Sequence, residues 1–162
     1  TPIAKYFKEI YATEFLYDDD GVPVWPAMAV NYTNKTQFLF RINKGVLKVW
    51  DDEKLNAYVK EEERRIPFRN MIYIGDGLTD VPCMKLVKLN KGKSIAVFRK
   101  RKKEVAAQLM SEDRVDFITE ANYCKDGELD KIVKTIIEKM AVVEKLSRLH
   151  DKHKKSINKA TE

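Results

Sequence analysis

Cysteine is scarce in this sequence. Cys83 and Cys124 are the only two among 162 residues, too few for a disulfide framework and without the spacing of a metal site. Long hydrophobic runs are also missing, because every apolar run falls far short of the roughly 20 residues that span a bilayer, and no signal peptide precedes them. These absences exclude a disulfide-rich secreted domain and a membrane-spanning protein. We therefore expect a cytoplasmic protein without a membrane partner.

The charge of the chain is unevenly distributed. The overall composition, with 44% hydrophobic and 35% charged residues, is typical of a globular protein with a packed core. The formal net charge is +6. Positions 99–103 form an unbroken block of lysines and arginines, and positions 145–159 are also strongly basic. Such blocks can bind nucleic acid. Because no base-stacking aromatic pattern or nucleic-acid motif accompanies them, we expect nucleic acid to be an unlikely partner.

The order of the predicted elements indicates an α/β fold. From position 27 onward, short apolar runs alternate with helical patterns, an order that favours a parallel sheet with flanking helices. The turn Asp18–Gly21 between two extended runs predicts a small β-hairpin before that sheet. The predicted helices cover 3–12, 33–44, 52–64, 82–90, 105–110 and 129–146, and the predicted strands cover 13–17, 22–25, 27–32, 71–74, 94–98 and 115–118, with a short extended piece at 46–50.

One stretch of the predicted sheet carries an acidic loop. An apolar strand over 71–74 ends at Gly75, and Asp76 and Asp80 occupy the turn before a helix that starts near Pro82. Two carboxylates in this spacing, with glycines on both sides of the first, can approach one hard cation such as Mg²⁺. The competing interpretation is a surface turn in which Asp80 caps the following helix.

Strand polarity brings further charged residues toward that loop. The carboxyl ends of parallel strands lie at one edge of the sheet, so residues that follow different strands converge there. Lys35 follows one strand, in the first turn of its helix, and the block that contains Arg99 and Arg101 follows another. Carboxylates for a divalent cation, beside a lysine and more positive charge, are typical of a phosphate site.

The motifs Gly75-Asp76-Gly77-Leu78-Thr79-Asp80 and Thr33-Asn34-Lys35 resemble the fourth and third motifs of the haloacid dehalogenase (HAD) superfamily of phosphohydrolases. The resemblance implies a Rossmann-like core, a Mg²⁺ cofactor and a small phosphorylated substrate that an aspartate attacks to give an aspartyl-phosphate. It implies that Asp76 and Asp80 hold metal, with Asp80 also able to orient Lys35, and that Lys35 and Gly77 lie at the phosphate. Arg99 and Arg101 would attract the anionic substrate. The resemblance covers about 3–145.

Two features depart from the family pattern. Lys35 and Asp76 lie farther apart in the sequence than expected, which the extra stretch 46–58 accounts for, with Lys44 as the fallback lysine. The first motif, an apolar strand followed by Asp-x-Asp that carries the nucleophile, has Asp18–Gly21 as its one candidate. We reject this candidate because no crossover helix follows it and a hairpin turn explains it.

We therefore expect an incomplete core. The chain starts with Thr1 rather than Met, and a helical pattern begins at once, which leads us to expect a segment of a longer polypeptide. Residues 1–145 would be the C-terminal part of a HAD-like core and 146–162 a basic, flexible tail. The missing N-terminal half of the same core would supply the nucleophile, and this chain alone would be inactive. The alternatives are a non-catalytic or regulatory HAD-like domain and a basic nucleic-acid-binding module.

Overall fold

The computed structural model describes residues 2–100 and 102–160, which form a mixed α/β fold. Five strands and five α-helices are present in this part of the chain, together with four short 3₁₀ helices at Ala4–Tyr6, Glu61–Glu63, Phe68–Asn70 and Leu78–Asp80. The strands are β1 (Glu14–Tyr17), β2 (Pro23–Met28), β3 (Ile72–Gly75), β4 (Lys93–Phe98) and β5 (Phe117–Glu120). The α-helices are α1 (Lys35–Lys44), α2 (Asp52–Asn56), α3 (Val81–Leu89), α4 (Glu104–Ser111) and α5 (Glu128–Ala160).

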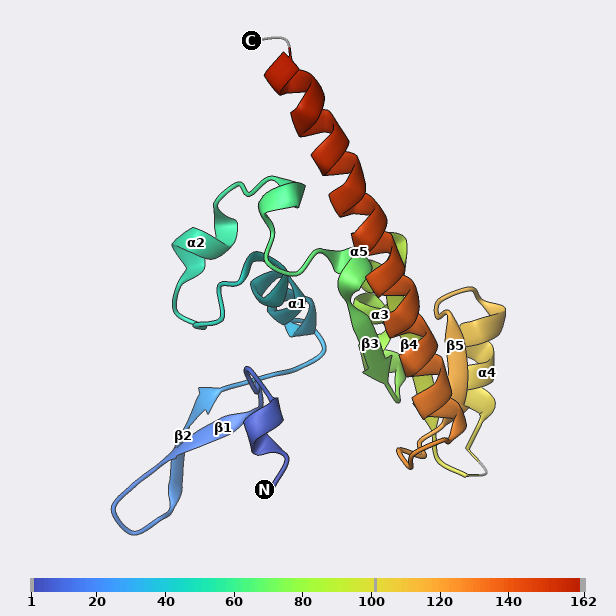
Figure 1. The fold of residues 1–162 in the computed structure, drawn as a ribbon. Coiled ribbons are helices and arrows are strands. Elements are labelled where there is room, and N and C mark those ends of the chain that lie inside the picture. The colour runs from blue at the N-terminus through green and yellow to red at the C-terminus, as the bar shows by residue number, and fades with distance from the viewer. Residues whose placement is uncertain (1, 101, 161–162) are drawn as a thin grey trace.

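A three-stranded parallel sheet in the order β3-β4-β5 organises the molecule. Helices α3 and α4 pack against one face of this sheet, and the first half of α5 covers the other face (Figure 1). Consecutive strands are joined through α3 and α4, the crossover that parallel neighbours require. The predicted parallel sheet with flanking helices is therefore confirmed over residues 72–120.

The side chains of β4 divide between two apolar clusters because successive residues of a strand point to opposite faces. Ile95 and Val97 pack with residues of α5, and Ala96 packs on the opposite face with residues of α3 and α4. The α5 cluster includes Leu129 and Ile136, and the opposite cluster contains Val81, Met84, Ala106, Leu109 and Val115. Burial on both faces explains why residues 95–98 of β4 form an uninterrupted apolar run.

The β-hairpin predicted around Asp18–Gly21 is confirmed, with β1 and β2 pairing antiparallel. Its second strand continues beyond Pro26 to Met28. A proline, which has no N–H to donate, is tolerated there because both strands of a two-stranded sheet are edge strands. The predicted buried strand over 27–32 is wrong, because all but two of its residues are exposed and only its first two belong to β2. The hairpin projects away from the parallel sheet (Figure 1).

Two predicted helices are largely absent. In the region 3–12 the structure has one 3₁₀ turn, and three of the apolar side chains that gave the helical pattern, Ile3, Phe7 and Ile10, are exposed. The fourth, Tyr11, is partly buried and packs against Phe38. An amphipathic pattern stabilises a helix only where its apolar face packs. The charged region 52–64 contains the short helix α2 and a 3₁₀ turn, and Leu55 is its one buried apolar side chain. The extended piece predicted at 46–50 contains no strand.

Helix α1 agrees with the prediction at its C-terminal end. Gly45 follows the last turn with φ of +76° and donates its N–H to the carbonyl of Ile42, which ends the helix. Helix α5 is longer than predicted and runs through the basic segment to Ala160. Its second half extends beyond the body of the molecule (Figure 1). None of the helices in 2–100 and 102–160 combines the length and apolarity needed to cross a membrane.

Candidate functional site

The carboxylate of Asp80 is the centre of a hydrogen-bonded cluster at the carboxyl end of β3. Its Oδ1 atom accepts hydrogen bonds from Lys35 Nζ and from the Tyr73 hydroxyl, both at 2.8 Å. The backbone N–H of Asp76 donates to Asp80 Oδ2 at 3.2 Å. Asp80 is only 6% exposed. Three donors therefore converge on one buried carboxylate.

This environment keeps Asp80 ionised. Burial opposes the charged form, but the hydrogen bonds from Lys35 and Tyr73 outweigh it and hold the pKa of Asp80 below its ordinary value. Burial, together with the hydrogen bond to Asp80, raises the pKa of Tyr73 well above the usual range. Tyr73 therefore remains a protonated donor, and Asp80 remains an acceptor for it and for Lys35.

Gly75 makes room for this carboxylate. A Cβ atom added to Gly75 would lie 2.8 Å from the Cβ, Cγ and Oδ2 atoms of Asp80, closer than side chains approach in folded proteins. Gly77, the next glycine of the loop, has open space instead, with Thr79 Oγ1 as its nearest neighbour at 4.0 Å. The first glycine thus permits the close approach of Asp80 to β3, and the second does not limit packing.

Lys35 reaches the cluster from the first turn of α1. Its side chain is 30% exposed, so one part contacts Asp80 and another faces solvent. Asn34 precedes it at the N-cap but makes no capping hydrogen bond. Its side chain instead binds the preceding loop, donating to Ala29 O at 2.6 Å and accepting from Asn31 N at 2.8 Å. Asn34 therefore fixes the entry of the chain into α1.

Lys44 lies at the other end of α1 and binds elsewhere. Its Nζ atom donates to the carbonyl oxygens of Leu55 and Ala57, both at 2.7 Å. These contacts tie α1 to the end of α2. Of the two lysines considered from the sequence, Lys35 is therefore the one that contacts the acidic loop.

Asp76 differs from Asp80 in its surroundings. Its side chain is exposed and makes no hydrogen bond or ion pair with the residues that the structure describes. Within 2–100 and 102–160, no group of three or more His, Cys, Asp or Glu side chains is arranged to hold a metal ion. Asp76 is consequently the carboxylate free to take a new ligand, while both oxygens of Asp80 already accept hydrogen bonds.

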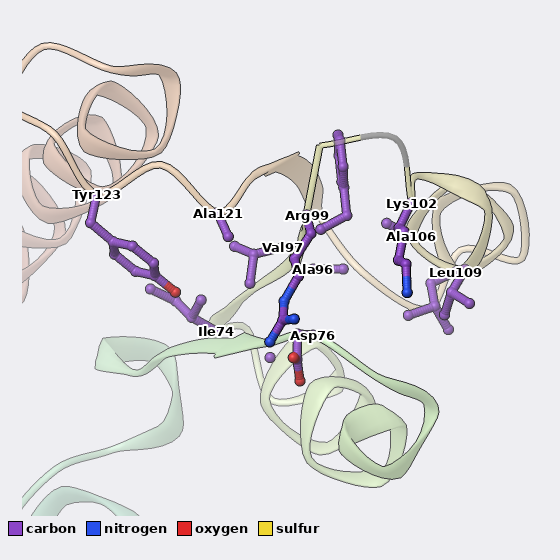
Figure 2. Close-up of a pocket in the computed structure, with 13 residues that line it drawn as sticks. Ile74, Asp76, Ala96, Val97, Arg99, Lys102, Ala106, Leu109, Ala121 and Tyr123 are labelled. Atoms are coloured by element: carbon purple, nitrogen blue, oxygen red, sulfur yellow. The ribbon is translucent and has the colours of Figure 1, made fainter.

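A pocket of about 520 Å³ opens beside Asp76 at the same edge of the sheet. Arg99 and Lys102, which follow β4, line it, and Tyr123, which follows β5, lines another side (Figure 2). Strand polarity thus brings two residues of the basic block, Arg99 and Lys102, to the acidic loop. Arg101 lies outside the described residues.

Tyr73 is the member of the cluster that the sequence did not predict. A tyrosine in an apolar strand is ordinarily assigned to the core, and Tyr73 does pack against the cluster formed by α3, α4 and β4. The two-residue period of a strand could have indicated that Tyr73 lies near Asp80. Tyr73 and Gly75 lie on the same face of β3, and Gly75 adjoins Asp80.

Comparison with known proteins finds similarity to an uncharacterized protein of Borreliella burgdorferi strain B31. The identity is 31% over 158 residues, an alignment that covers 86% of this chain and 52% of the relative. The chain thus spans about half the length of the protein it matches. No protein-family model matches the chain. No solved structure matches it either.

Proposed function

We propose that this chain carries the lysine-and-aspartate half of a HAD-type, Mg²⁺-dependent phosphohydrolase site in a Rossmann-like core. The observation that supports it is the ion pair between Lys35 Nζ and Asp80 Oδ1 at 2.8 Å. This contact joins two motifs, 33–35 and 75–80, that are distant in sequence and each resemble a motif of the same superfamily. The substrate would be a small phosphorylated molecule, cleaved through an aspartyl-phosphate.

Each member of the cluster has a role in this proposal. The ammonium of Lys35 offsets negative charge on the phosphoryl group as an aspartate attacks phosphorus and the bond to the leaving oxygen breaks. Asp80 holds that ammonium in place, and Tyr73 fixes the orientation of the carboxylate. The loop at Gly77 provides an open backbone segment beside the phosphate, since the nearest neighbour of a Cβ added there is Thr79 Oγ1 at 4.0 Å.

The residues present fit a magnesium ion in part. The free carboxylate of Asp76 would be its ligand, whereas Asp80 would act through Lys35 because its oxygens are occupied by three donors. When bound, the metal would neutralise charge on the phosphoryl oxygens. Its remaining ligands would be water, the phosphate itself and groups from the rest of the core.

The nucleophile is assigned to the missing N-terminal half of the core. Asp18 is committed to its hairpin turn, where Oδ1 accepts from the backbone N–H groups of Asp20 at 3.1 Å and Val22 at 2.8 Å. β3 is an edge strand of the described sheet. An apolar pocket of about 450 Å³, lined in part by Ile72 and Tyr73, runs beside it. A further parallel strand at that edge would place its carboxyl end near Asp76.

A phosphatase assay on the full-length gene product tests the proposal. We expect Mg²⁺-dependent hydrolysis of p-nitrophenyl phosphate that falls by about 100-fold or more in both Asp76→Asn and Lys35→Ala, as expected for the loss of a group acting in the transition state. Undiminished activity in both variants would overturn the assignment. Phosphate binding without turnover would indicate the regulatory alternative. Salt-dependent binding of DNA or RNA would indicate the nucleic-acid alternative.

A further inference from the structure

The pocket beside Asp76 has the features of a small-ligand site. Apolar side chains from the ends of β3 and β4 and from α4, which we call its floor, line the pocket together with polar groups. The polar groups are Asp76, Arg99, Lys102 and Tyr123. A concave surface that combines apolar side chains with convergent polar groups is common in ligand pockets, and about 520 Å³ is a typical size.

The two cations of this pocket form no ion pair within the described chain. Neither Arg99 nor Lys102 forms a side-chain hydrogen bond or a salt bridge with the described residues. Figure 2 shows both side chains extending into the pocket, with the guanidinium of Arg99 pointing toward Asp76. The arrangement therefore places two positive groups and one negative group, Asp76, at the same cavity, which leaves an excess of positive charge there.

The start of α4 adds to this positive field. Val105 and Ala106, in the first turn of α4, line the pocket, and the N-cap residue Lys103 makes no side-chain capping hydrogen bond. The first backbone N–H groups of a helix attract anions. They favour an anion at this end of α4, although Glu104 in the same turn offsets part of the effect, so Arg99 and Lys102 contribute most of the positive charge.

We propose that the pocket between β3 and α4 is a second anion-binding site, which takes a phosphate group of the ligand through Arg99 and Lys102. Asp76 stands between this pocket and the Lys35–Asp80 cluster. The substrate would then carry two anionic groups, one at Lys35 and one at Arg99, joined by a small apolar body over the floor. This assignment of the substrate class rests on the proposed function, whereas anion binding in the pocket does not.

Titration of the chain with inorganic phosphate, without Mg²⁺, tests the pocket directly. We expect saturable NMR shifts of the Arg99 Nε–H and of the Lys102 and Val105 amides. The double substitution Arg99→Gln/Lys102→Gln should weaken this binding by about tenfold, the loss expected for charge-assisted hydrogen bonds. The control Lys100→Gln/Lys125→Gln removes the same charge from exposed positions outside the pocket and should change it less than about twofold.

The outcomes separate the two proposals. An equal loss in both double variants, or shifts confined to the surroundings of Lys35 and Gly77, would overturn the pocket assignment and leave the proposed function standing. If the NMR shifts at Arg99, Lys102 and Val105 persist in a full-length protein that has no phosphatase activity, the anion site stands and the proposed catalytic function is wrong.

Ligands with one and two phosphates test the substrate class. We expect that at least one alkanediol bisphosphate, with a spacer of about two to six carbons, binds about tenfold more tightly than the alkyl monophosphate of equal length. The advantage should disappear in Arg99→Gln/Lys102→Gln. If no spacer length gives an advantage, the inference of a doubly anionic substrate is wrong.

Discussion

Gly75 and Asp80 share the space at the end of β3, which makes the glycine a constraint on the site. We expect Gly75→Ala to displace the Asp80 carboxylate, because the new Cβ would lie 2.8 Å from it. Overpacking of this kind costs about 1–3 kcal/mol. Urea denaturation would measure the loss of stability, and NMR would show movement of the Tyr73 and Lys35 signals.

Gly77→Ala is the matched control for that substitution. Its added Cβ would meet nothing closer than 4.0 Å, and its φ of −149° suits any residue. We expect its free energy of unfolding to stay within about 0.5 kcal/mol of the unsubstituted chain. Equal destabilisation by the two substitutions would contradict the packing described at Gly75.

The pKa of Asp80 makes its contribution to stability depend on pH. Its folded-state value lies below the unfolded value of about 3.9, so ionised Asp80 stabilises the folded chain above that pH. The contribution is lost as the pH falls through the folded-state pKa. We expect Asp80→Asn to cost about 2 kcal/mol at pH 7, since it weakens hydrogen bonds to a charged group. Urea denaturation from pH 7 to 3 should show this cost shrinking below about pH 4, and a cost independent of pH would contradict the ionised cluster.

Part of the site could be predicted at the scale of residues. Lys35 and Asp80 do lie together, but the strand that was expected before Lys35 is absent from the parallel sheet, and Lys35 reaches Asp80 from the start of α1 instead. Strand polarity does account for Arg99, which follows β4, beside Asp76, which follows β3. Tyr73 could not be distinguished from ordinary core residues in the sequence. The acceptor of its hydroxyl, Asp80, lies in the loop after β3, and only the folded structure shows that the two side chains meet. The different surroundings of Asp76 and Asp80 also required coordinates, since the sequence treats the two carboxylates alike.

Elements were predicted well where local pattern and packing agree. β3, β4, α3 and α4 are short apolar segments bounded by glycine, proline or charged residues, and all of them pack around one sheet. The region 3–12 has a helical pattern, but Ile3, Phe7 and Ile10 are exposed, and of the pattern's side chains Tyr11 is the one that packs, on Phe38. Hydrophobic periodicity alone therefore predicts helices that do not form in segments outside the core.

The two halves of α5 are expected to differ in their contribution to stability. Ile136, in the first half, is buried against β4, whereas Leu146 and Leu149 are largely exposed. We expect Ile136→Ala to cost about 2–5 kcal/mol, as buried truncations do. Deletion of residues 150–162 should cost less than about 1 kcal/mol.

Chemical denaturation of both α5 variants checks this expectation. A deletion at least as costly as Ile136→Ala would show that the second half of α5 packs in solution. Near-equal stability of the deletion variant and the intact chain would leave the parallel sheet and its covering helices as the stable unit.

At the scale of the whole molecule, apolar surface is exposed on one side of the parallel sheet. The hairpin carries exposed Phe15, Leu16 and Trp25, and the pocket beside β3 is mainly apolar. Isolated two-stranded hairpins are marginally stable in water, and large exposed apolar patches usually mark interfaces. Under the proposed function, the N-terminal half of the core would cover this surface and bring the nucleophile to Asp76.

The central claim is that Lys35, held by Asp80, acts on the phosphoryl group. The most direct measurement is kcat of the full-length gene product for p-nitrophenyl phosphate in Lys35→Met and Lys44→Met, two lysines of the same helix. We predict a fall of about 100-fold or more in Lys35→Met. Lys44→Met, which removes contacts to Leu55 and Ala57, should keep kcat within about threefold once folding is verified. An unchanged kcat in Lys35→Met, or a larger loss in Lys44→Met, would contradict the account.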